Sequence, residues 1–183
     1  MSVYRRVSGK LRRAGRGVVD RTGITAGDFA RTRSGAIIEG RTSHHLLIAP
    51  PGAGNIGDQA MVEAFVQAVE GLPTLIVTRA ETDFVLPADL AGKASIVALP
   101  KLLYGEGRAH RRDVARLGEL VGAAASVSVI GADIMDGVYS LRSSIRRSSI
   151  VAVAAGRGID ATVIGFSWNA AAPPPARSAL ATA

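Results

Sequence analysis

The fold of this chain is decided by the stretch His45-Leu-Leu-Ile-Ala-Pro-Pro-Gly-Ala-Gly-Asn-Ile-Gly-Asp-Gln-Ala-Met-Val-Glu-Ala-Phe65. It begins with a short apolar run, continues through a glycine-rich turn and ends in apolar residues at helical spacing. A strand, a tight turn and a helix in this order are typical of open α/β sheets, which bind ligands at the carboxyl ends of their strands. Glycines in such a turn let the backbone approach a ligand closely. The turn is therefore the first candidate binding site.

Four more apolar runs follow this one, and turn residues bound each of them. Together the five runs cover residues 45–49, 74–78, 95–99, 126–130 and 161–165. They are apolar throughout, which predicts strands covered on both faces. Helical patterns separate them, marked by Met61, Val62, Phe65, Val66 and Val69, by Val114, Leu117, Leu120 and Val121, and by Val138, Leu141 and Ile145. The alternation predicts an α/β fold with a doubly wound, mainly parallel, Rossmann-like sheet.

Two segments between these elements carry further expectations. Pro100 and the glycines of residues 104–107 interrupt the helical pattern, which predicts a loop on the same edge of the sheet as the glycine-rich turn. The quasi-repeat Arg142-Ser-Ser-Ile-Arg-Arg-Ser-Ser-Ile150 is predicted to lie on the surface of a helix. It is too short for an architectural repeat.

The positive charge lies at the start of the chain. Residues 1–41 contain ten Arg and Lys against three Asp and Glu, whereas residues 42–183 contain twelve of each kind. We interpret residues 1–41 as a basic lead-in, either solvated or in weak contact with anionic lipid or another polyanion. Scarce aromatic residues argue against specific nucleic-acid binding. Residues 42–170 form the predicted Rossmann-like domain, and residues 171–183 a truncated linker and helix start.

Composition excludes several classes of protein. The chain has no cysteine, which rules out a disulfide framework, a thiolate metal site and a cysteine nucleophile. No apolar run reaches the ~18 residues of a membrane span, and no secretory signal pattern follows the N-terminus. His44, His45 and His110 have no partner at metal-ligand spacing, so we expect no metal site. We expect a cytoplasmic protein, with a peripheral position at the inner face of the membrane as an option.

The glycine-rich turn also matches a dinucleotide fingerprint, Gly52-x-Gly54-x-x-Gly57. That motif needs the pyrophosphate to sit on the helix N-terminus, where free N–H groups favour an anion. Asp58 places a carboxylate in this first turn, and two unit charges about 4 Å apart repel by ~4 kcal/mol at an effective dielectric of ~20. This argues against NAD(P). Asp58 is either the N-cap of its own helix or a group that faces a ligand.

A second polar loop follows the fourth predicted strand. Asp133 and Asp136 lie three residues apart, and Gly131 and Gly137 permit tight turns around them. Two carboxylates at this edge can bind sugar hydroxyls, act as a general base or hold a divalent cation. The alternative is that they cap the turn and the next helix.

A third polar loop follows the fifth predicted strand. Ser167 and Asn169 can form hydrogen bonds with a polar ligand there. Trp168 between them can stack on the face of a sugar or pack against the protein. The sequence therefore predicts three polar loops on one edge of one sheet.

These three loops resemble the N-terminal half of the polysaccharide pyruvyl transferase family. Gly54-Asn-Ile-Gly-Asp-Gln-Ala60 fits the family's Gly-Asn-x-Gly-Asp pattern. Ile130-Gly-Ala-Asp-Ile-Met-Asp136 is similar to its Gly-Gly/Ala-Asp segment, and Gly165-Phe-Ser167 to its Gly-x-Ser. The resemblance covers about residues 45–170, in the family's order. It implies the N-terminal domain of a GT-B fold. It also implies transfer of a pyruvyl group from phosphoenolpyruvate to a sugar of a cell-surface polysaccharide or its precursor, as a ketal.

The resemblance also implies residue roles. Asp133 and Asp136 would be catalytic, and a saccharide acceptor would contact Gly54, Asn55, Gly57, Asp58, Gly131, Ser167 and Asn169. No cofactor is implied, since phosphoenolpyruvate is a substrate. The family's basic donor-binding residues and catalytic histidine lie in a C-terminal half, so we expect this chain to need that missing half and to be nearly inactive alone. The alternative is a Rossmann-like domain that binds a nucleotide or a sugar without catalysis.

Overall fold

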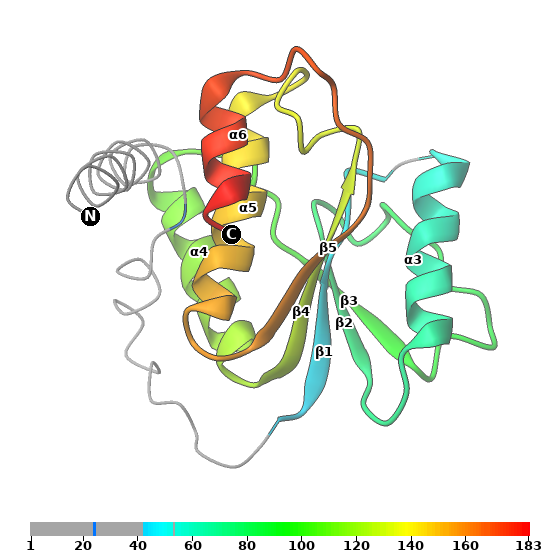
Figure 1. The fold of residues 1–183 in the computed structure, drawn as a ribbon. Helices are drawn as coiled ribbons and strands as arrows, with labels where there is room; N and C mark the ends of the chain where they lie inside the picture. Colours follow the sequence, from blue (N-terminus) through cyan, green and yellow to red (C-terminus); the bar gives the residue numbers. More distant parts are fainter. Residues whose placement is uncertain (1–23, 25–41, 53) are drawn as a thin grey trace, which may run out of the picture.

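The computed structural model describes residues 24, 42–52 and 54–183, which contain a five-stranded parallel sheet (Figure 1). Its strands are β1 (His44–Ile48), β2 (Thr74–Thr78), β3 (Ala94–Ala98), β4 (Ala124–Ala132) and β5 (Asp160–Phe166). The strand order is β3-β2-β1-β4-β5, and every neighbouring pair is parallel. Each predicted apolar run coincides with one of these strands within a few residues. The predicted parallel α/β sheet is confirmed.

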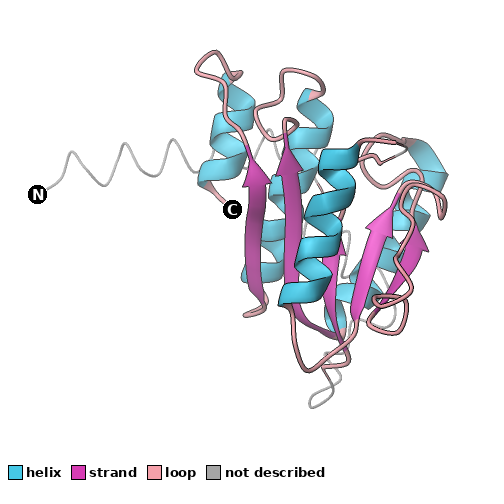
Figure 2. Cartoon of the chain, turned by 90° about the vertical axis from the view of Figure 1, so that its right-hand side faces the viewer, coloured by secondary structure: helices cyan, strands magenta, loops and turns pink. Residues whose placement is uncertain are grey.

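Helices cover both faces of the sheet. Helix α3 (Ile56–Ala68) lies on one face, and α4 (Gly107–Gly122) and α5 (Leu141–Ala155) lie on the other (Figure 1). Helix α6 (Pro174–Ala181) packs beside α5 and buries Ala176 and Ala179. The layers are also visible in the side view of Figure 2, where strands run between the helices. The arrangement is Rossmann-like and doubly wound, as predicted.

The core has two parts because successive strand residues point to opposite faces. Toward α3, Leu47 and Ile76 pack with Val62 and Val66. Toward α4 and α5, a second cluster includes Leu46, Ile48, Val127, Val129, Val114, Leu117 and Val121. β1 is therefore buried on both faces, as its uninterrupted apolar run predicts.

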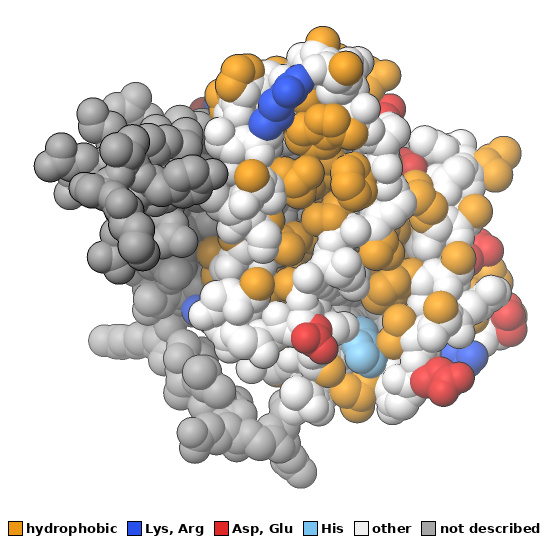
Figure 3. Space-filling model, viewed as in Figure 1, with side chains coloured by type: hydrophobic (Ala, Val, Ile, Leu, Met, Phe, Trp, Pro, Cys, Tyr) orange, Lys and Arg blue, Asp and Glu red, His pale blue; other side chains and the backbone are white. Residues whose placement is uncertain are grey.

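The edge strand β5 differs from this prediction. No residue of β5 is fully buried: three are half-buried and four are exposed, and Phe166 at its end is 44% exposed. Figure 3 shows apolar side chains gathered on the face between α6 and α3. The prediction that all five strands are covered on both faces is wrong for β5, because it has a strand neighbour on one side only within the described residues and no helix crosses it on the α3 face.

The strand order creates a switch point between β1 and β4. From β1 the chain moves outward to β2 and β3, and it then returns to the other side of β1 to form β4. The connections after β1 and β4 thus leave toward opposite faces: α3 follows β1 and α5 follows β4. Ligands of open α/β sheets bind at such a point, outside the carboxyl ends of the strands.

Two predictions about the third helix are wrong. Val138 does not belong to it, since α5 begins at Leu141 with Ser140 as its N-cap and Val138 is 54% exposed in the preceding turn. The quasi-repeat of residues 142–150 lies on α5 but not on its surface, because every residue after Arg142 is buried. The sheet, α6 and residues 102–105 pack around this helix, so polar side chains of the repeat face protein.

The basic lead-in lies almost wholly outside the described residues. Of residues 1–41 only Ile24 is described; it is buried, and its N–H donates to Ser149 Oγ at 2.9 Å. A search of the described part of the chain finds no helix long and apolar enough to cross a membrane.

Candidate functional site

The loop between β1 and α3 is built around Asn55. Its Oδ1 accepts hydrogen bonds from the N–H groups of Gly57 (3.0 Å) and Asp58 (3.4 Å), which makes Asn55 the N-cap of α3. Gly54 has φ +96°, a left-handed conformation that favours glycine. The interpretation of Asp58 as the N-cap is therefore wrong, because Asn55 occupies that position.

Asp58 lies in the first turn of α3, where its side chain is buried. The residue is 6% exposed, and its carboxyl forms no hydrogen bond or ion pair with the described residues. Burial raises the pKa of the Asp58 carboxyl above its ordinary value of 3.8; the charge of Asp133 raises it further, and that of Arg147 opposes the shift. Asp58 and Asp133 thus interact electrostatically from two neighbouring loops at the switch point.

The two aspartates after β4 have different environments. Asp136 is buried, and its Oδ1 accepts a hydrogen bond from the Val138 N–H at 2.9 Å, as in an Asx turn. Asp133 is exposed and forms no hydrogen bond or ion pair with any residue that the structure describes. A carboxylate without a partner among the described residues can accept a proton, or a hydrogen bond, from the hydroxyl group of a ligand. Asp133 is therefore the better placed of the two for chemistry.

Two glycines of these loops have a packing role. A Cβ on Gly131 would collide with Met135 Cγ and Phe166 Cβ, so the turn after β4 packs tightly against β5. Gly57 lies inside the first turn of α3, and a Cβ there would lie 3.3 Å from Asn55 Oδ1. Gly131 is buried, so it shapes the loop rather than offering a surface to a ligand.

The loop after β5 stands apart from the carboxylates. The Ser167 N–H donates to the Ala132 carbonyl at 3.0 Å, and the Asn169 side-chain oxygen accepts from the Ala171 N–H at 2.8 Å. Both side chains are exposed, and Trp168 between them is 36% exposed. No hydrogen bond within the described residues joins Ser167 or Asn169 to Asp58 or Asp133. The structure places this loop at the predicted edge and joins its backbone to the loop after β4, but it does not bring the side chains of Ser167 and Asn169 into contact with the carboxylates by a hydrogen bond.

The histidines have structural partners. His44 is buried, and its Nε2 lies 3.0 Å from the Leu120 carbonyl; burial lowers the pKa of its imidazole. His45 Nδ1 pairs with Ser126 Oγ at 2.8 Å, and His110 Nδ1 with the Lys101 carbonyl at 3.0 Å. Among the residues described, no group of three acidic or histidine side chains could hold a metal ion.

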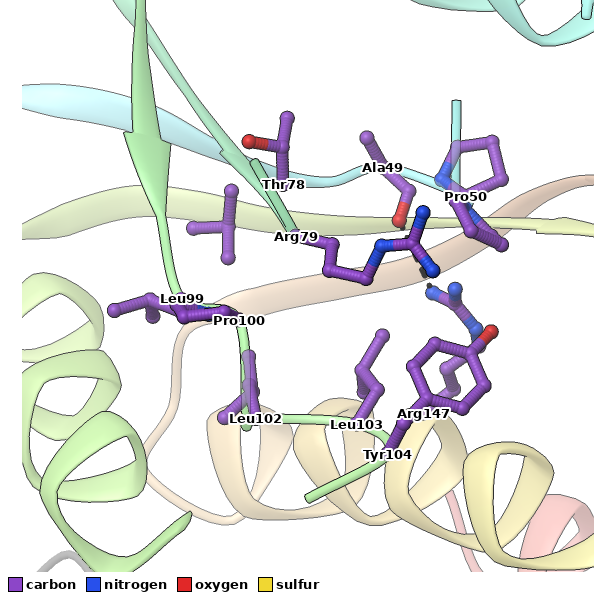
Figure 4. A pocket seen from close by; sticks show the side chains of 12 residues that line it. Ala49, Pro50, Thr78, Arg79, Leu99, Pro100, Leu102, Leu103, Tyr104 and Arg147 are labelled. Atoms are coloured by element: carbon purple, nitrogen blue, oxygen red, sulfur yellow. Dashed lines mark hydrogen bonds between the residues drawn. The ribbon is translucent and has the colours of Figure 1, made fainter. Parts of the chain in front are cut away.

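A hollow at the carboxyl ends of β1, β2 and β3 was missed by the reasoning from sequence. Its volume is about 300 Å³, which includes the space open to solvent at its mouth. Its lining includes Pro50, Thr78, Arg79, Leu103, Tyr104 and Arg147 (Figure 4). Tyr104 comes from the loop of residues 100–107, which was correctly predicted to lie on the same edge as the glycine-rich turn. The loops after β1, β2 and β3, together with Arg147 of α5, thus line one small hollow with two cationic side chains.

Neighbouring loops fix the rim of this hollow. Asp83 Oδ2 accepts hydrogen bonds from the N–H groups of Arg79 (3.0 Å) and Ala80 (2.9 Å), which holds the turn after β2. A Cβ on Gly52 would collide with the Asp83 carbonyl oxygen, so the loops after β1 and β2 are in close contact. Only glycine permits this approach at position 52, which explains one glycine of the fingerprint without a nucleotide.

Arg147 reaches the hollow from α5 and has no exposed surface. Its Nη1 donates to the Ala49 carbonyl at 3.3 Å, while Nε and Nη2 have no hydrogen-bond partner among the described residues. Burial lowers the pKa of the Arg147 guanidinium, and the neighbouring Tyr104 and Asp58 oppose this shift. A sequence signal existed: Arg147 lies in a helix between Ile145 and Ile150, which are both in the core.

No family model, curated protein or solved structure matches this chain. Its class thus rests on the fold and the site alone. It is an α/β Rossmann-like domain, and the carboxyl edge of its sheet carries a pair of interacting carboxylates and a hollow lined by two arginines.

The raised pKa of Asp58 predicts a pH-dependent cost to stability. Below pH 3.8 the carboxyl is protonated in both the folded and the unfolded state, so it contributes no penalty. As the pH rises through the raised pKa of the folded state, ionisation destabilises the fold. Asp58→Asn is therefore expected to raise the free energy of unfolding at pH 7 and to leave it unchanged at pH 3.

Urea unfolding of the wild type and the variant across this pH range measures the difference. The exposed Asp89 supplies a control, Asp89→Asn, which removes the same charge outside the site. An Asp58→Asn protein that is less stable than the wild type at pH 7 would show that the carboxylate stabilises the fold.

Proposed function

We propose that this chain is the acceptor-binding domain of a pyruvyl transferase-like enzyme, with a saccharide as acceptor and phosphoenolpyruvate as donor. One observation carries the proposal: the exposed carboxylate of Asp133, which the described residues leave unbonded, interacts with the buried Asp58 at the switch point of the sheet. Ligands of such sheets bind at this place. The resemblance of residues 54–60 and 130–136 to the family's motifs agrees with it.

In this proposal Asp133 acts as the general base. Its carboxylate accepts the proton of a sugar hydroxyl as the hydroxyl oxygen bonds to the central carbon of the enolpyruvyl group, whose methylene carbon takes up a proton from solvent or from an acid outside this chain and becomes the methyl group. A second hydroxyl of the same sugar completes the ketal, and one phosphate leaves for each ketal formed. The buried Asp58 sets the local charge, and Asn55 holds the first loop against α3. Asp136 keeps the second loop in its turn. The reaction is placed in the cytoplasm, as expected from the sequence.

Two measurements on the whole chain test the proposal. First, nucleotide-activated hexoses and short oligosaccharides are titrated against the protein, and saturable binding is followed by saturation-transfer NMR. Second, phosphate release from phosphoenolpyruvate is measured at high protein concentration with each saccharide that binds. We expect saturable binding of at least one saccharide. We also expect phosphate release that depends on it and is slow, because the resemblance implies that the donor-binding residues lie outside this chain.

Binding without release supports the other candidate, a sugar-binding Rossmann-like domain without catalysis. No binding and no release would overturn both. NAD(P) serves as the negative control, since the buried Asp58 in the first turn of α3 disfavours a pyrophosphate on that helix.

A further inference from the structure

The hollow near the carboxylates contains a buried cation that forms no ion pair with any residue the structure describes. Arg147 is fully buried, and two of its three guanidinium nitrogens have no hydrogen-bond partner among the described residues. Buried charges in proteins are normally paired or hydrogen-bonded, because removing them from water is unfavourable. Figure 4 shows the guanidinium at the side of the hollow, next to the ring of Tyr104. Hydrogen bonding with the Tyr104 hydroxyl opposes the fall in the pKa of the Arg147 guanidinium, but no described residue forms an ion pair with the guanidinium nitrogens.

The remaining lining has the character of an anion site. Arg79 supplies a second guanidinium on the rim, and Tyr104 supplies a phenol beside Arg147 (Figure 4). No acidic side chain is among the described residues that line the hollow. Two arginines and a phenol match the oxygens of a carboxylate or a phosphate, which arginine binds through parallel hydrogen bonds.

The nearest internal candidate for the counterion does not fill this role. Asp58 interacts electrostatically with Arg147, but the two form no ion pair within 4 Å. Asp58 also does not line the hollow. Arg147 thus has no carboxylate partner in the described part of the chain. Because Arg147 has no exposed surface, an oxyanion in the hollow reaches its guanidinium only when a lining side chain such as that of Tyr104 moves aside.

We infer that Arg147 and Arg79 form a binding site for the oxyanion group, carboxylate or phosphate, of a small ligand. The volume of about 300 Å³ includes space open to solvent, so the enclosed part of the hollow is small. It suits a single carboxylate or phosphate group whose remainder lies in solvent. The inference is independent of the proposed function, because it rests on Arg147 and the hollow and not on Asp133. The inference assigns anion-binding groups to this chain. The resemblance to the pyruvyl transferase family, by contrast, implies that such groups lie in a C-terminal half.

The test is an anion titration of the whole chain. Sodium phosphate and sodium acetate are each titrated at an ionic strength held constant with sodium chloride, and amide shifts in ¹H–¹⁵N NMR spectra are recorded. We expect saturable shifts of residues around the hollow with at least one of the two anions. Shifts with phosphate only, or with acetate only, identify which oxyanion the site takes.

Three variants connect the binding to the hollow. Arg147→Met is expected to lower the affinity for the anion at least about tenfold, since a charge-assisted hydrogen bond contributes a factor of that order. Arg79→Gln, at an exposed position, is expected to lower the affinity for the anion severalfold without affecting the fold. Lys93→Gln is the matched control, because Lys93 is an exposed cation just before β3, at the opposite edge of the sheet. It is expected to bind like the wild type.

Three results would overturn the inference. The first is the absence of a saturable response to either anion beyond that to chloride. The second is wild-type affinity in both arginine variants. The third is an equal loss of affinity in Lys93→Gln, which would indicate attraction by overall charge. If Arg147→Met does not fold, Arg79→Gln and Tyr104→Phe decide, since both change side chains that are at least partly exposed.

Discussion

Asp133→Asn is expected to lower the rate of saccharide-dependent phosphate release by about 10²–10⁴-fold, the usual contribution of a general base. Asparagine keeps the size of the side chain and its ability to bond a hydroxyl, but it cannot take up the proton. Saccharide affinity is therefore expected to change little. Asp133 is exposed and unbonded to the described residues, so the melting temperature is also expected to stay at the wild-type value. Single-turnover phosphate release and the binding titration separate these quantities.

Two further aspartates serve as controls for this experiment. Asp136→Asn removes a buried carboxylate that accepts the Val138 N–H, so it is expected to lower the stability and to affect the rate through the turn. Asp160→Asn removes an exposed carboxylate at the start of β5, far from the carboxyl edge, and is expected to change neither. An unchanged rate in Asp133→Asn would remove Asp133 from the mechanism and leave the domain as a binding module.

The sheet could be predicted from the sequence because its signals are local. Each strand is a run of apolar residues with turn residues at both ends, and the parallel order follows from the helices between them. β5 shows the limit of this reasoning. Its composition resembles that of β1, yet β1 is buried on both faces and β5 is not. Which strand lies at an edge depends on the strand order, and composition does not encode it.

The position of the candidate site could be predicted from the sequence, but the roles of its residues could not. Asn55, Asp58 and Asp133 could be placed at one edge because each follows the carboxyl end of a strand. Their roles could not be assigned: whether Asn55 or Asp58 caps α3 depends on backbone dihedral angles around Gly54. Arg147 was assigned to the surface because charged residues are rarely buried without partners. It is buried because the loop of residues 100–107 and α6 pack on α5, and these contacts are distant in sequence.

Arg146→Met is expected to lower the free energy of unfolding by about 2–5 kcal/mol. The Arg146 guanidinium donates through Nη1 to the carbonyls of Leu102 (3.3 Å), Leu103 (2.9 Å) and Gly105 (2.8 Å). Methionine leaves these carbonyls without that donor, and each buried acceptor left unpaired costs about 1–3 kcal/mol. Because the same loop carries Tyr104, the variant is also expected to bind oxyanions more weakly. Urea unfolding and the anion titration measure the two effects.

Arg147→Met gives the opposite expectation at the next position. Arg147 makes one long hydrogen bond of 3.3 Å and leaves two nitrogens unpaired, so methionine removes an uncompensated buried charge and keeps a similar volume. Replacing buried charges with apolar residues is often neutral or stabilising by about 1–4 kcal/mol. The variant is expected to be at least as stable as the wild type and to bind oxyanions no longer. That result would show that Arg147 binds a ligand and does not stabilise the fold. A large loss of stability would instead show that Arg147 is a structural residue like Arg146. The main evidence that the hollow binds a ligand would then be gone.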